Sequence, residues 1–459
     1  MLSRYASCMA TPAREVAYDI LLRVEQQDAY ASELLHGGRL ESLSPDDRNL
    51  ATEIVMGTLR WRARLDFGIA AVSKEPLHKL DKEVLIALRV GAYQIGWLRL
   101  PARAAVNESV ELVKRARFRY SAPYVNAVLR KIAAQPELME PVLSPGPKTV
   151  VDIAALYSHP LWLVERWGVA YGLETAEKIC AYDQEVPPTA IRLSLAHPSK
   201  NSQGGAPEVL VEELKREGIE LAPGALLKSA RRVVKGDVTH TKAFAEGRVA
   251  IQDEASQLVA LLVGTGERLL DCCAAPGGKT AILAERNPQS RIVAAELHPQ
   301  RAELMKQRLA SAKNVQVVTA DVADLPPGAG FDRVLADVPC SGTGTLARNP
   351  EIKWRLNVDD LADLHARQAG ILNAAIERLR PGGRVVYSSC SLEAEENAGV
   401  VEEVLRTRVD VRLHEARAVL AEIDELLLSP DQLVSDPYVR TLPGVHPCDG
   451  FFAAVLAKA

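Results

Sequence analysis

The 459-residue sequence lacks several patterns that mark whole classes of protein. It contains no apolar run long enough to span a bilayer, and residues 1–11 lack the apolar stretch of a secretory signal. Its seven cysteines are scattered and never form a Cys-x-x-Cys pair, so neither a disulfide framework nor a zinc site is indicated. A formal net charge of −4 excludes a uniformly basic surface, so nucleic acid would have to bind at local patches. We therefore expect a cytoplasmic protein without a metal or a membrane contact.

Length and hydrophobic content predict at least two domains, because 459 residues with 47% hydrophobic composition exceed the usual size of one domain. The first part, to about Ala134, has helical periodicity, with Val84 and Leu88 on one face of a helix that Asp81 is placed to cap. Several prolines then break this pattern between residues 135 and 150. The sequence therefore predicts an all-α domain that ends in a linker.

The remainder of the chain divides into two further parts. Residues 152–246 are mixed, with a strand-like run at 189–195 and a helix-like run at 207–217. From Glu267 onward strands alternate with helices, which is typical of a parallel, doubly wound sheet. There is no internal repeat or low-complexity tract.

A strand, a turn and a helix near residue 270 form the first element with chemical content. Residues 268–273 predict an apolar strand, residues 274–278 a turn without bulky side chains, and residues 279–286 a helix. In an open α/β sheet, ligands lie outside the carboxyl ends of the strands, and small residues let a ligand approach the backbone closely. The turn is therefore a candidate cofactor site.

Two carboxylates follow the next strands. Glu296 ends the strand predicted at 291–295, where an acidic side chain accepts hydrogen bonds from ribose hydroxyls. Asp321 follows the strand predicted at 315–319 and is placed for the adenine end of the same ligand. This pattern favours a cofactor that carries adenosine, although either carboxylate alone also fits a helix cap or a surface charge.

The same turn leaves a rival interpretation open. Gly278-Lys279-Thr280 copies the end of a phosphate-binding loop, and residues 334–337 copy an apolar strand that ends in aspartate. The first glycine of such a loop would fall at Cys273, however, and Pro276 stiffens the turn. These departures count against a nucleoside triphosphatase.

Two cysteines follow strands downstream of the turn, in DVPC (residues 337–340) and SSC (residues 388–390). We expect both thiols in the cleft that the glycine turn lines. A thiolate is a strong nucleophile, and its addition to carbon 6 of cytosine would make carbon 5 able to attack an electrophile. Asp337 is placed to help through the ring nitrogen and the exocyclic amine. Either cysteine alone also fits a small buried apolar residue.

Three motifs resemble those of the Sun/NOL1/NOP2 family of RNA 5-methylcytosine methyltransferases. They are LDCCAAPGGKT (270–280), DVPCSGTG (337–344) and YSSCSL (387–392). Further segments similar to that family are residues 252–256, 349–354 and 449–452. Near the N-terminus, three segments resemble the NusB-like domain of the bacterial RsmB branch: residues 53–60, 101–108 and 125–130. The resemblance covers the chain after about Thr11, which leaves Met9 as an alternative start to Met1.

The resemblance implies a multidomain fold. Residues 11–140 would form an all-α NusB-like RNA-binding domain, and residues 150–246 a small α+β linker or RNA-binding domain. Residues 247–459 would form an α/β Rossmann-like class I methyltransferase domain.

The resemblance also implies an activity, namely S-adenosylmethionine-dependent methylation of carbon 5 of a cytosine in bacterial 16S rRNA. Cys390 would be the nucleophile, Cys340 the thiol for product release, and Asp337 the group that activates the cytosine. The implied cofactor-binding positions are Cys273, Ala274, Ala275, Pro276, Gly277, Gly278, Lys279, Glu296, Asp321 and Asp337. Spacing alone does not order the two thiols or identify the base that removes the carbon 5 proton. We expect a monomer.

The candidates for RNA contact are four basic residues: Arg60, Arg62, Arg192 and Lys353. Trp61 lies between the first two, Trp354 follows Lys353, and Ser194, near Arg192, stands where the family often carries asparagine. A solvated helix face also explains a basic run. Because a cytosine must leave its helix to reach a buried thiol, we expect single-stranded or loop RNA.

Two other functions stay open at this point. A non-catalytic RNA-binding or antitermination factor could be built on the NusB-like domain, although the intact cysteines favour an enzyme. An amino-methyltransferase would want Asp-Pro-Pro-Tyr or a relative at residues 337–340 and would not need Cys390. Val338 and Ser389 depart from the family pattern at variable places and leave the carboxylate and both thiols intact.

Overall fold

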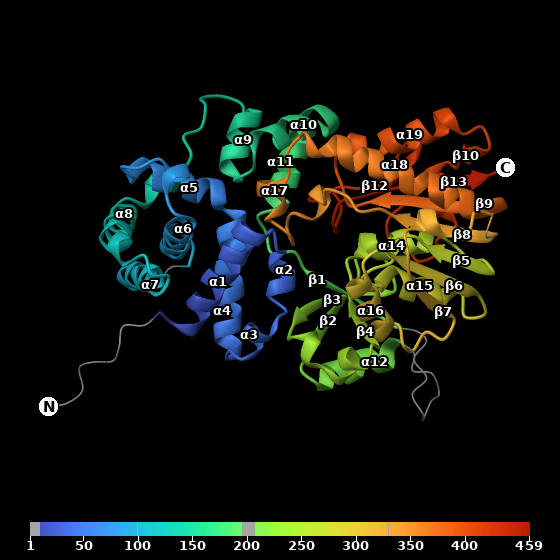
Figure 1. Ribbon diagram of the computed structural model, residues 1–459, viewed down its shortest axis with the longest axis horizontal. Helices are drawn as coiled ribbons and strands as arrows, with labels where there is room; N and C mark the ends of the chain where they lie inside the picture. The colour runs from blue at the N-terminus through green and yellow to red at the C-terminus, as the bar shows by residue number, and fades with distance from the viewer. Residues whose placement is uncertain (1–9, 99, 195–206, 329) are drawn as a thin grey trace. The chain divides into compact units, whose positions relative to one another are not determined.

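The computed structural model describes residues 10–98, 100–194, 207–328 and 330–459, so the alternative start at Met9 lies outside the described residues. The chain forms two compact units (Figure 1). Unit 1 comprises Met1–Val186 and Leu346–Arg355, and unit 2 comprises Pro187–Thr345 and Leu356–Ala459. The chain thus leaves unit 2 shortly after Cys340, contributes a short segment to unit 1, and returns.

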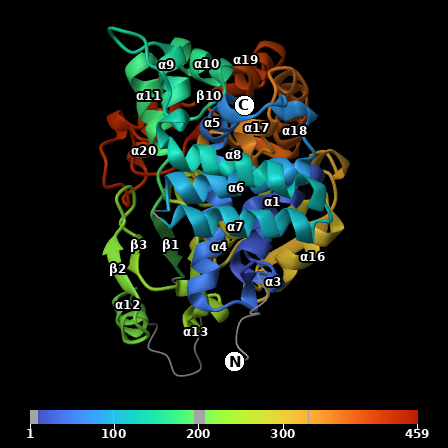
Figure 2. The same ribbon diagram turned by 90° about the vertical axis from the view of Figure 1, so that its left-hand side faces the viewer.

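Unit 1 is helical, as the sequence predicts. Its helices are α1 (Pro12–Gln27), α2 (Ala31–Leu34), α3 (Gly38–Glu41), α4 (Pro45–Arg60), α5 (Arg62–Val72), α6 (Lys82–Gly96), α7 (Ala102–Arg115), α8 (Ala122–Ala134), α9 (Val150–Leu156), α10 (Leu161–Tyr171), α11 (Leu173–Tyr182) and α17 (Ile352–Arg355). Helix α6 packs against α1, α7 and α8 (Figure 2). Gly91 allows the close approach to α8, because a Cβ there would lie 2.4 Å from Leu129.

The predicted cap of α6 has a different role. Asp81 occupies the N-cap position but makes no side-chain cap bond. Its carboxylate instead accepts a hydrogen bond of 2.9 Å from the hydroxyl of Tyr120. The face that the sequence predicts is buried, with Val84 and Leu88 in the helical core.

The first part of unit 2 is a four-stranded antiparallel sheet in the order β2-β3-β1-β4. Its elements are β1 (Thr189–Leu193), β2 (Glu220–Pro223), β3 (Ala230–Lys235) and β4 (Val249–Ile251), with helices α12 (Pro207–Arg216) and α13 (Lys242–Ala245). Helices α9 to α11 group with unit 1 and not with this sheet. The division into units therefore differs from the predicted small domain at 150–246, and our domain boundaries stay a prediction.

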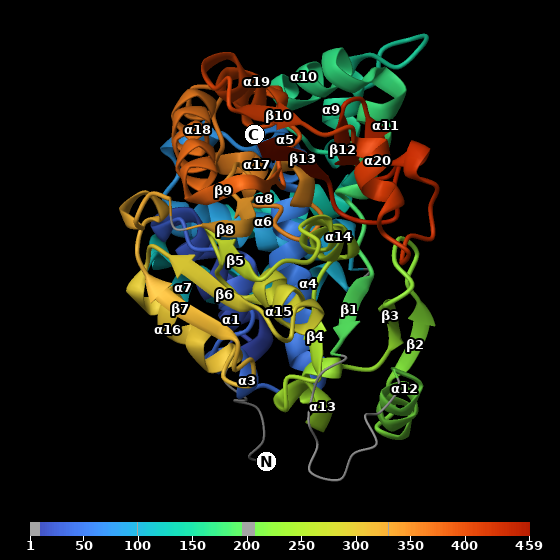
Figure 3. The ribbon, with the colours of Figure 1, turned by 90° about the vertical axis from the view of Figure 1, so that its right-hand side faces the viewer.

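The larger sheet of unit 2 carries the strand ends of interest. Its strands are β5 (Arg268–Asp271), β6 (Arg291–Glu296), β7 (Val315–Thr319), β8 (Phe331–Asp337), β9 (Leu379–Ser389), β10 (Val411–Leu413), β11 (Val434–Ser435), β12 (Tyr438–Thr441) and β13 (Phe451–Lys458). The order is β11-β12-β13-β9-β8-β5-β6-β7, and β10 pairs with β13. Figure 3 shows β5 to β9 side by side.

The prediction of a parallel sheet holds for β5 to β9 only. These five strands pair in parallel, whereas β13 runs antiparallel to β9, β10 and β12. A parallel pair needs a crossover of a dozen or more residues, and the loop of residues 442–450 between β12 and β13 is too short for one. The sheet is therefore mixed.

Helices cover both faces of this sheet. Helices α18 (Asp360–Arg378) and α19 (Ala398–Thr407) share one apolar cluster with β8 and β9. Helices α14 (Glu254–Leu262), α15 (Gly278–Arg286) and α20 (Ala416–Ala421) share a second cluster with these strands, and α16 (Pro299–Arg308) packs on β6 and β7. Two covered faces leave the strand ends as the place for a polar site. Among the described helices, none combines the length and the hydropathy needed to cross a membrane.

Candidate active site

The predicted cofactor turn lies between β5 and α15, at the carboxyl end of β5. The strand ends at Asp271, two residues earlier than predicted, and the helix begins at Gly278. Gly277 has φ = 99°, and a Cβ there would lie 3.1 Å from Met305, so this position requires glycine. The turn thus presents backbone and small side chains at the strand end, formed by Cys273, Ala274, Ala275, Pro276, Gly277 and Gly278.

The two carboxylates predicted to follow the next strands lie at the adjacent strand ends. Glu296 is the last residue of β6, is buried, and accepts a hydrogen bond of 2.9 Å from the backbone N–H of His298. Asp321 follows β7 and accepts one of 2.8 Å from the N–H of Ala323, so it also caps the short helix η5 (Val322–Asp324). Asp321 therefore has the role of a helix cap, which the sequence left open beside a cofactor contact.

Lys279 contacts Asp337 at the end of β8. Its Nζ lies 2.7 Å from Oδ2 of Asp337, whose Oδ1 accepts a hydrogen bond of 2.8 Å from the hydroxyl of Ser388. Burial lowers the pKa of Lys279, but the attraction of Asp337, and to a lesser degree that of a Cys390 thiolate, outweighs it and raises the pKa overall. The lysine that suggested a phosphate-binding loop is therefore paired with a carboxylate.

The sequence did not single out Asp271 as a site residue. It is buried at the end of β5 and accepts a hydrogen bond of 2.7 Å from the hydroxyl of Thr280. Burial raises the pKa of Asp271 to about 7, against the opposing effect of the Thr280 hydrogen bond. A carboxyl that stays partly protonated at neutral pH thus lies beneath the turn.

The two thiols meet at the ends of β8 and β9. The Sγ atoms of Cys340 and Cys390 lie 3.1 Å apart, and the N–H of Cys390 lies 3.2 Å from Sγ of Cys340. The hydrogen bond with Cys390, together with burial, raises the pKa of Cys340 and keeps it a thiol. Burial also raises the pKa values of Cys272 and Cys273, so these two are poor nucleophiles.

Two of the predicted RNA contacts are buried within unit 1. Arg60 is 5% exposed and donates a hydrogen bond of 2.9 Å to the carbonyl of Ala347. Lys353 is 1% exposed and donates one of 3.0 Å to the carbonyl of Arg60. These side chains fasten residues 346–355 to α4 and present no cation to a phosphate, so the prediction that they bind RNA loses its basis.

The other two predicted contacts also have protein partners. Arg62 donates to both carboxylate oxygens of Glu25, at 3.0 and 3.2 Å. Arg192 is buried and donates at 2.6 Å to Glu285, which also accepts a hydrogen bond of 2.7 Å from Ser194. The serine that departs from the family pattern therefore has a structural partner. A phosphate would have to displace these carboxylates to reach either arginine.

The burial of Lys353 predicts how the stability of the fold depends on pH. Burial lowers its pKa from 10.5 to about 7, only partly offset by Asp183. Between these two values the unfolded chain holds a proton that the folded chain lacks, so stability rises with pH by up to about 1.4 kcal/mol per pH unit. Lys353→Met should lose this rise. All five tryptophans lie in unit 1, so urea unfolding followed by tryptophan fluorescence at pH 7, 8 and 9 measures it. Parallel pH profiles for wild type and variant would contradict the burial account.

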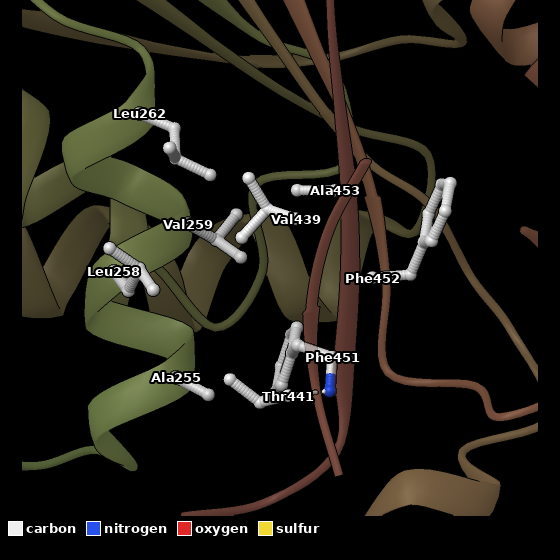
Figure 4. A pocket seen from close by; sticks show the side chains of 9 residues that line it. All are labelled: Ala255, Leu258, Val259, Leu262, Val439, Thr441, Phe451, Phe452 and Ala453. Carbon is white, nitrogen blue, oxygen red and sulfur yellow. Dashed lines mark hydrogen bonds between the residues drawn. The ribbon is translucent and has the colours of Figure 1, made fainter. Parts of the chain in front are cut away.

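Figure 4 shows an apolar hollow beside the sheet. Side chains of α14 face those of β12 and β13 across it, whereas Phe452 points to the opposite side of the strand. The lining residues are Ala255, Leu258, Val259, Leu262, Val439, Thr441, Phe451, Phe452 and Ala453. The hollow lies within helix-on-sheet packing and holds none of the predicted site residues.

Three families match consecutive parts of the chain. The NusB family matches residues 11–134, the ferredoxin-like domain described as Methyltr_RsmF/B-like matches 159–238, and 16S rRNA methyltransferase RsmB/F matches 258–457. The order of these matches is the order of parts that the sequence predicts.

Similar proteins extend over nearly the whole chain. The Bacillus subtilis (strain 168) protein named "Probable ribosomal RNA small subunit methyltransferase B" is 33% identical over 98% of this chain and 99% of its own. The Vibrio cholerae protein named "Ribosomal RNA small subunit methyltransferase B" is 34% identical over 91% of each chain. Among solved structures, a methyltransferase homolog protein from Pyrococcus horikoshii is 26% identical, covers 69% of this chain and 100% of its own, and has a TM-score of 0.55.

Proposed function

The chain belongs to the RsmB/F family of 16S rRNA methyltransferases, and from this premise we propose that it methylates carbon 5 of a cytosine in 16S rRNA through a covalent adduct with Cys390. One observation carries the proposal. Two thiols lie 3.1 Å apart at adjacent strand ends, where Lys279 and Asp337 also lie. Methyl transfer to an amine or a hydroxyl requires no thiol. Covalent activation of carbon 5 requires one thiol to add to carbon 6, and the second thiol can assist the release of the product.

The surrounding groups support Cys390 as the attacking thiol. Cys340 stays protonated and is within hydrogen-bond distance of Cys390. The ammonium group of Lys279 attracts a thiolate at Cys390. A thiolate is the form of cysteine that adds to a ring, and Lys279 and Cys340 are the neighbours of the sulfur at which we propose the addition.

The chemical steps then follow from the positions of these groups. Addition of the thiolate to carbon 6 breaks the carbon 5–carbon 6 double bond and moves its electrons to carbon 5. The Asp337 carboxylate accepts a hydrogen bond from the exocyclic amine of the cytosine. Lys279, which contacts Asp337, is the nearby hydrogen-bond donor to the base. Carbon 5 then forms a bond to the methyl group, whose bond to the donor sulfur breaks, so that the donor leaves as a neutral thioether. Loss of the carbon 5 proton to a base re-forms the carbon 5–carbon 6 double bond and expels Cys390. We assign Cys340 to this release, because it contacts the departing sulfur.

S-adenosylmethionine is the methyl donor, and when bound it supplies the electrophilic methyl group. The residues present fit it. The turn at 273–278 has small side chains and a glycine in the left-handed conformation, and Glu296 lies at the end of the second strand, where ribose hydroxyls are bound in such folds. We propose that Lys279, Asp321 and Asp337 line the same site.

Removing the Glu296 carboxylate tests this assignment. Glu296→Ala should weaken S-adenosylmethionine binding by about 1 to 3 kcal/mol, because a charge-assisted hydrogen bond is lost. Isothermal titration calorimetry on the full chain measures this, with Glu402→Ala, an exposed glutamate on α19, as the control. Equal affinities for Glu296→Ala and wild type would remove Glu296 from the site.

The proposed substrate is a loop or single-stranded cytosine, methylated in the cytoplasm by a monomer. The test is incubation of the full chain with labelled S-adenosylmethionine and either naked 16S rRNA or assembled small subunits. Nucleoside mass spectrometry should find 5-methylcytidine at one position. RNA that is bound but carries no methyl group in either form would contradict the proposal and favour a non-catalytic binding role.

A further inference from the structure

The loops that carry the two thiols meet at one buried carboxylate that no motif indicated. Glu396, in the short helix η7 (Ala394–Glu396), is 0% exposed. Its Oε1 accepts a hydrogen bond of 2.8 Å from the N–H of Ser341, and its Oε2 accepts one of 2.5 Å from the hydroxyl of Ser391. The hydroxyl of Ser341 also donates to Oε2. Since these serines directly follow Cys340 and Cys390, one carboxylate holds both thiol-bearing loops.

Helix α18 and strand β9 add further bonds to the same residue. Gln368 donates 2.9 Å hydrogen bonds to Oε1 of Glu396 and to the carbonyl of Pro339, just before Cys340. The hydroxyl of Tyr387 donates at 2.6 Å to the backbone carbonyl of Glu396. Helix α18 therefore holds the carboxylate of Glu396 and strand β9 holds its backbone, while the carboxylate in turn holds the two loops.

We propose that Glu396 is a positioning residue that sets the separation between Cys340 and Cys390. A buried carboxylate with several donors keeps a narrow geometry, because moving any donor away leaves charge unsatisfied in a low-dielectric interior. Charge-assisted hydrogen bonds are also stronger than neutral ones. The importance of this separation for catalysis rests on the proposed function, since it matters only where both thiols serve one cytosine.

The nearby charge has a second effect on the thiol pair. The hydrogen bond with Cys390 and burial are the main causes that raise the pKa of Cys340. The negative charge of Glu396 contributes to the same rise, to a lesser degree. The group that holds the loops thus also favours the protonated form of the thiol that we assign to release.

The placement of the two thiols can be tested without RNA or cofactor, because the rate at which they form a disulfide depends on the separation of their sulfur atoms. With 4,4′-dithiodipyridine as oxidant, one thiol attacks the reagent disulfide, forms a mixed disulfide and releases one thiopyridone. The second thiol attacks that mixed disulfide, forms the Cys340–Cys390 bond and releases a second thiopyridone. Samples of the full chain are quenched with N-ethylmaleimide, and peptide mass spectrometry counts the Cys340–Cys390 link against time.

Glu396→Asp keeps the charge and withdraws the carboxylate by one methylene, so the loops lose their common anchor. Closure should slow by about 10- to 100-fold, as expected when reacting atoms are misplaced by about 1 Å. Glu402→Asp makes the same change at an exposed glutamate of α19 and should close at the wild-type rate. Ser341→Ala removes one hydroxyl donor and should give a smaller slowing; it carries the test if Glu396→Asp does not fold.

The methyl transfer reaction provides the second readout. A positioning role predicts a lower kcat with an unchanged KM for S-adenosylmethionine in Glu396→Asp. Wild-type closure rates in both Glu396→Asp and Ser341→Ala would overturn the proposal. Slow closure with an unchanged kcat would leave Glu396 as the residue that sets the separation, but would overturn the assignment of Cys340 to release in the proposed function, so the two failures are distinguishable.

Discussion

Cys390→Ala should lower the rate of methyl transfer by on the order of 10⁴-fold or more, the loss seen when an enzyme's nucleophile is removed. Without the sulfur nothing adds to carbon 6, so carbon 5 stays a poor nucleophile even when the methyl donor is bound. The measurement is single-turnover transfer of a labelled methyl group to 16S rRNA. Binding of S-adenosylmethionine should stay close to that of wild type, because the turn and Glu296 are untouched.

Cys180→Ala is the matched control for that experiment. Cys180 is a buried thiol on α11 of unit 1, whereas Cys390 belongs to unit 2. Its loss should change the rate by no more than a few fold. Substantial methyl transfer by Cys390→Ala would contradict the nucleophile assignment, and a loss shared by both variants would point to a fold defect.

Cys340→Ala should allow the first half of the reaction and block the second. The variant should form a complex with 16S rRNA that survives denaturing electrophoresis, and turnover should stop after about one methyl group per enzyme. The physical reason is that Cys340 contacts the sulfur that must leave, at 3.1 Å, and is the thiol that stays protonated. Denaturing gels with end-labelled RNA measure the adduct.

The double variant Cys340→Ala/Cys390→Ala separates a covalent adduct from tight binding. It should form no denaturant-stable complex, because the sulfur that bonds to carbon 6 is gone. A stable complex in the double variant would contradict Cys390 as the attachment point. Normal multiple turnover by Cys340→Ala would remove that thiol from product release.

Local sequence patterns predicted the ends of β6 and β7 well, because these patterns depend on neighbouring residues. The apolar run at 315–319 is β7 to the residue, and Glu296 closes β6 as predicted. The turn after β5 was recognisable because small residues and a glycine in a left-handed conformation are needed there. The antiparallel strands β10 to β13 were missed, since local pattern does not fix which strand becomes a neighbour.

Contacts between residues that lie far apart in the chain could not be predicted from the sequence. Lys353 looked like an RNA contact because a basic residue beside tryptophan is typical of one, yet its partner is a carbonyl 293 positions away. Glu396 stands near Glu393 and Glu395, and nothing in the sequence tells which carboxylate turns toward the thiol loops. Asp271 was passed over because its burial, which raises its pKa, follows from packing and not from its neighbours in sequence.

The most direct test of the central claim is the fate of the hydrogen on carbon 5. 16S rRNA carrying tritium at carbon 5 of cytosine is incubated with the full chain and S-adenosylmethionine labelled with carbon-14 in the methyl group. Methylation at carbon 5 through a Cys390 adduct predicts one tritium released to water for each methyl group incorporated. Cys390→Ala should neither release tritium nor incorporate methyl groups. Methyl incorporation without tritium release would place the methyl group on another atom and contradict the account.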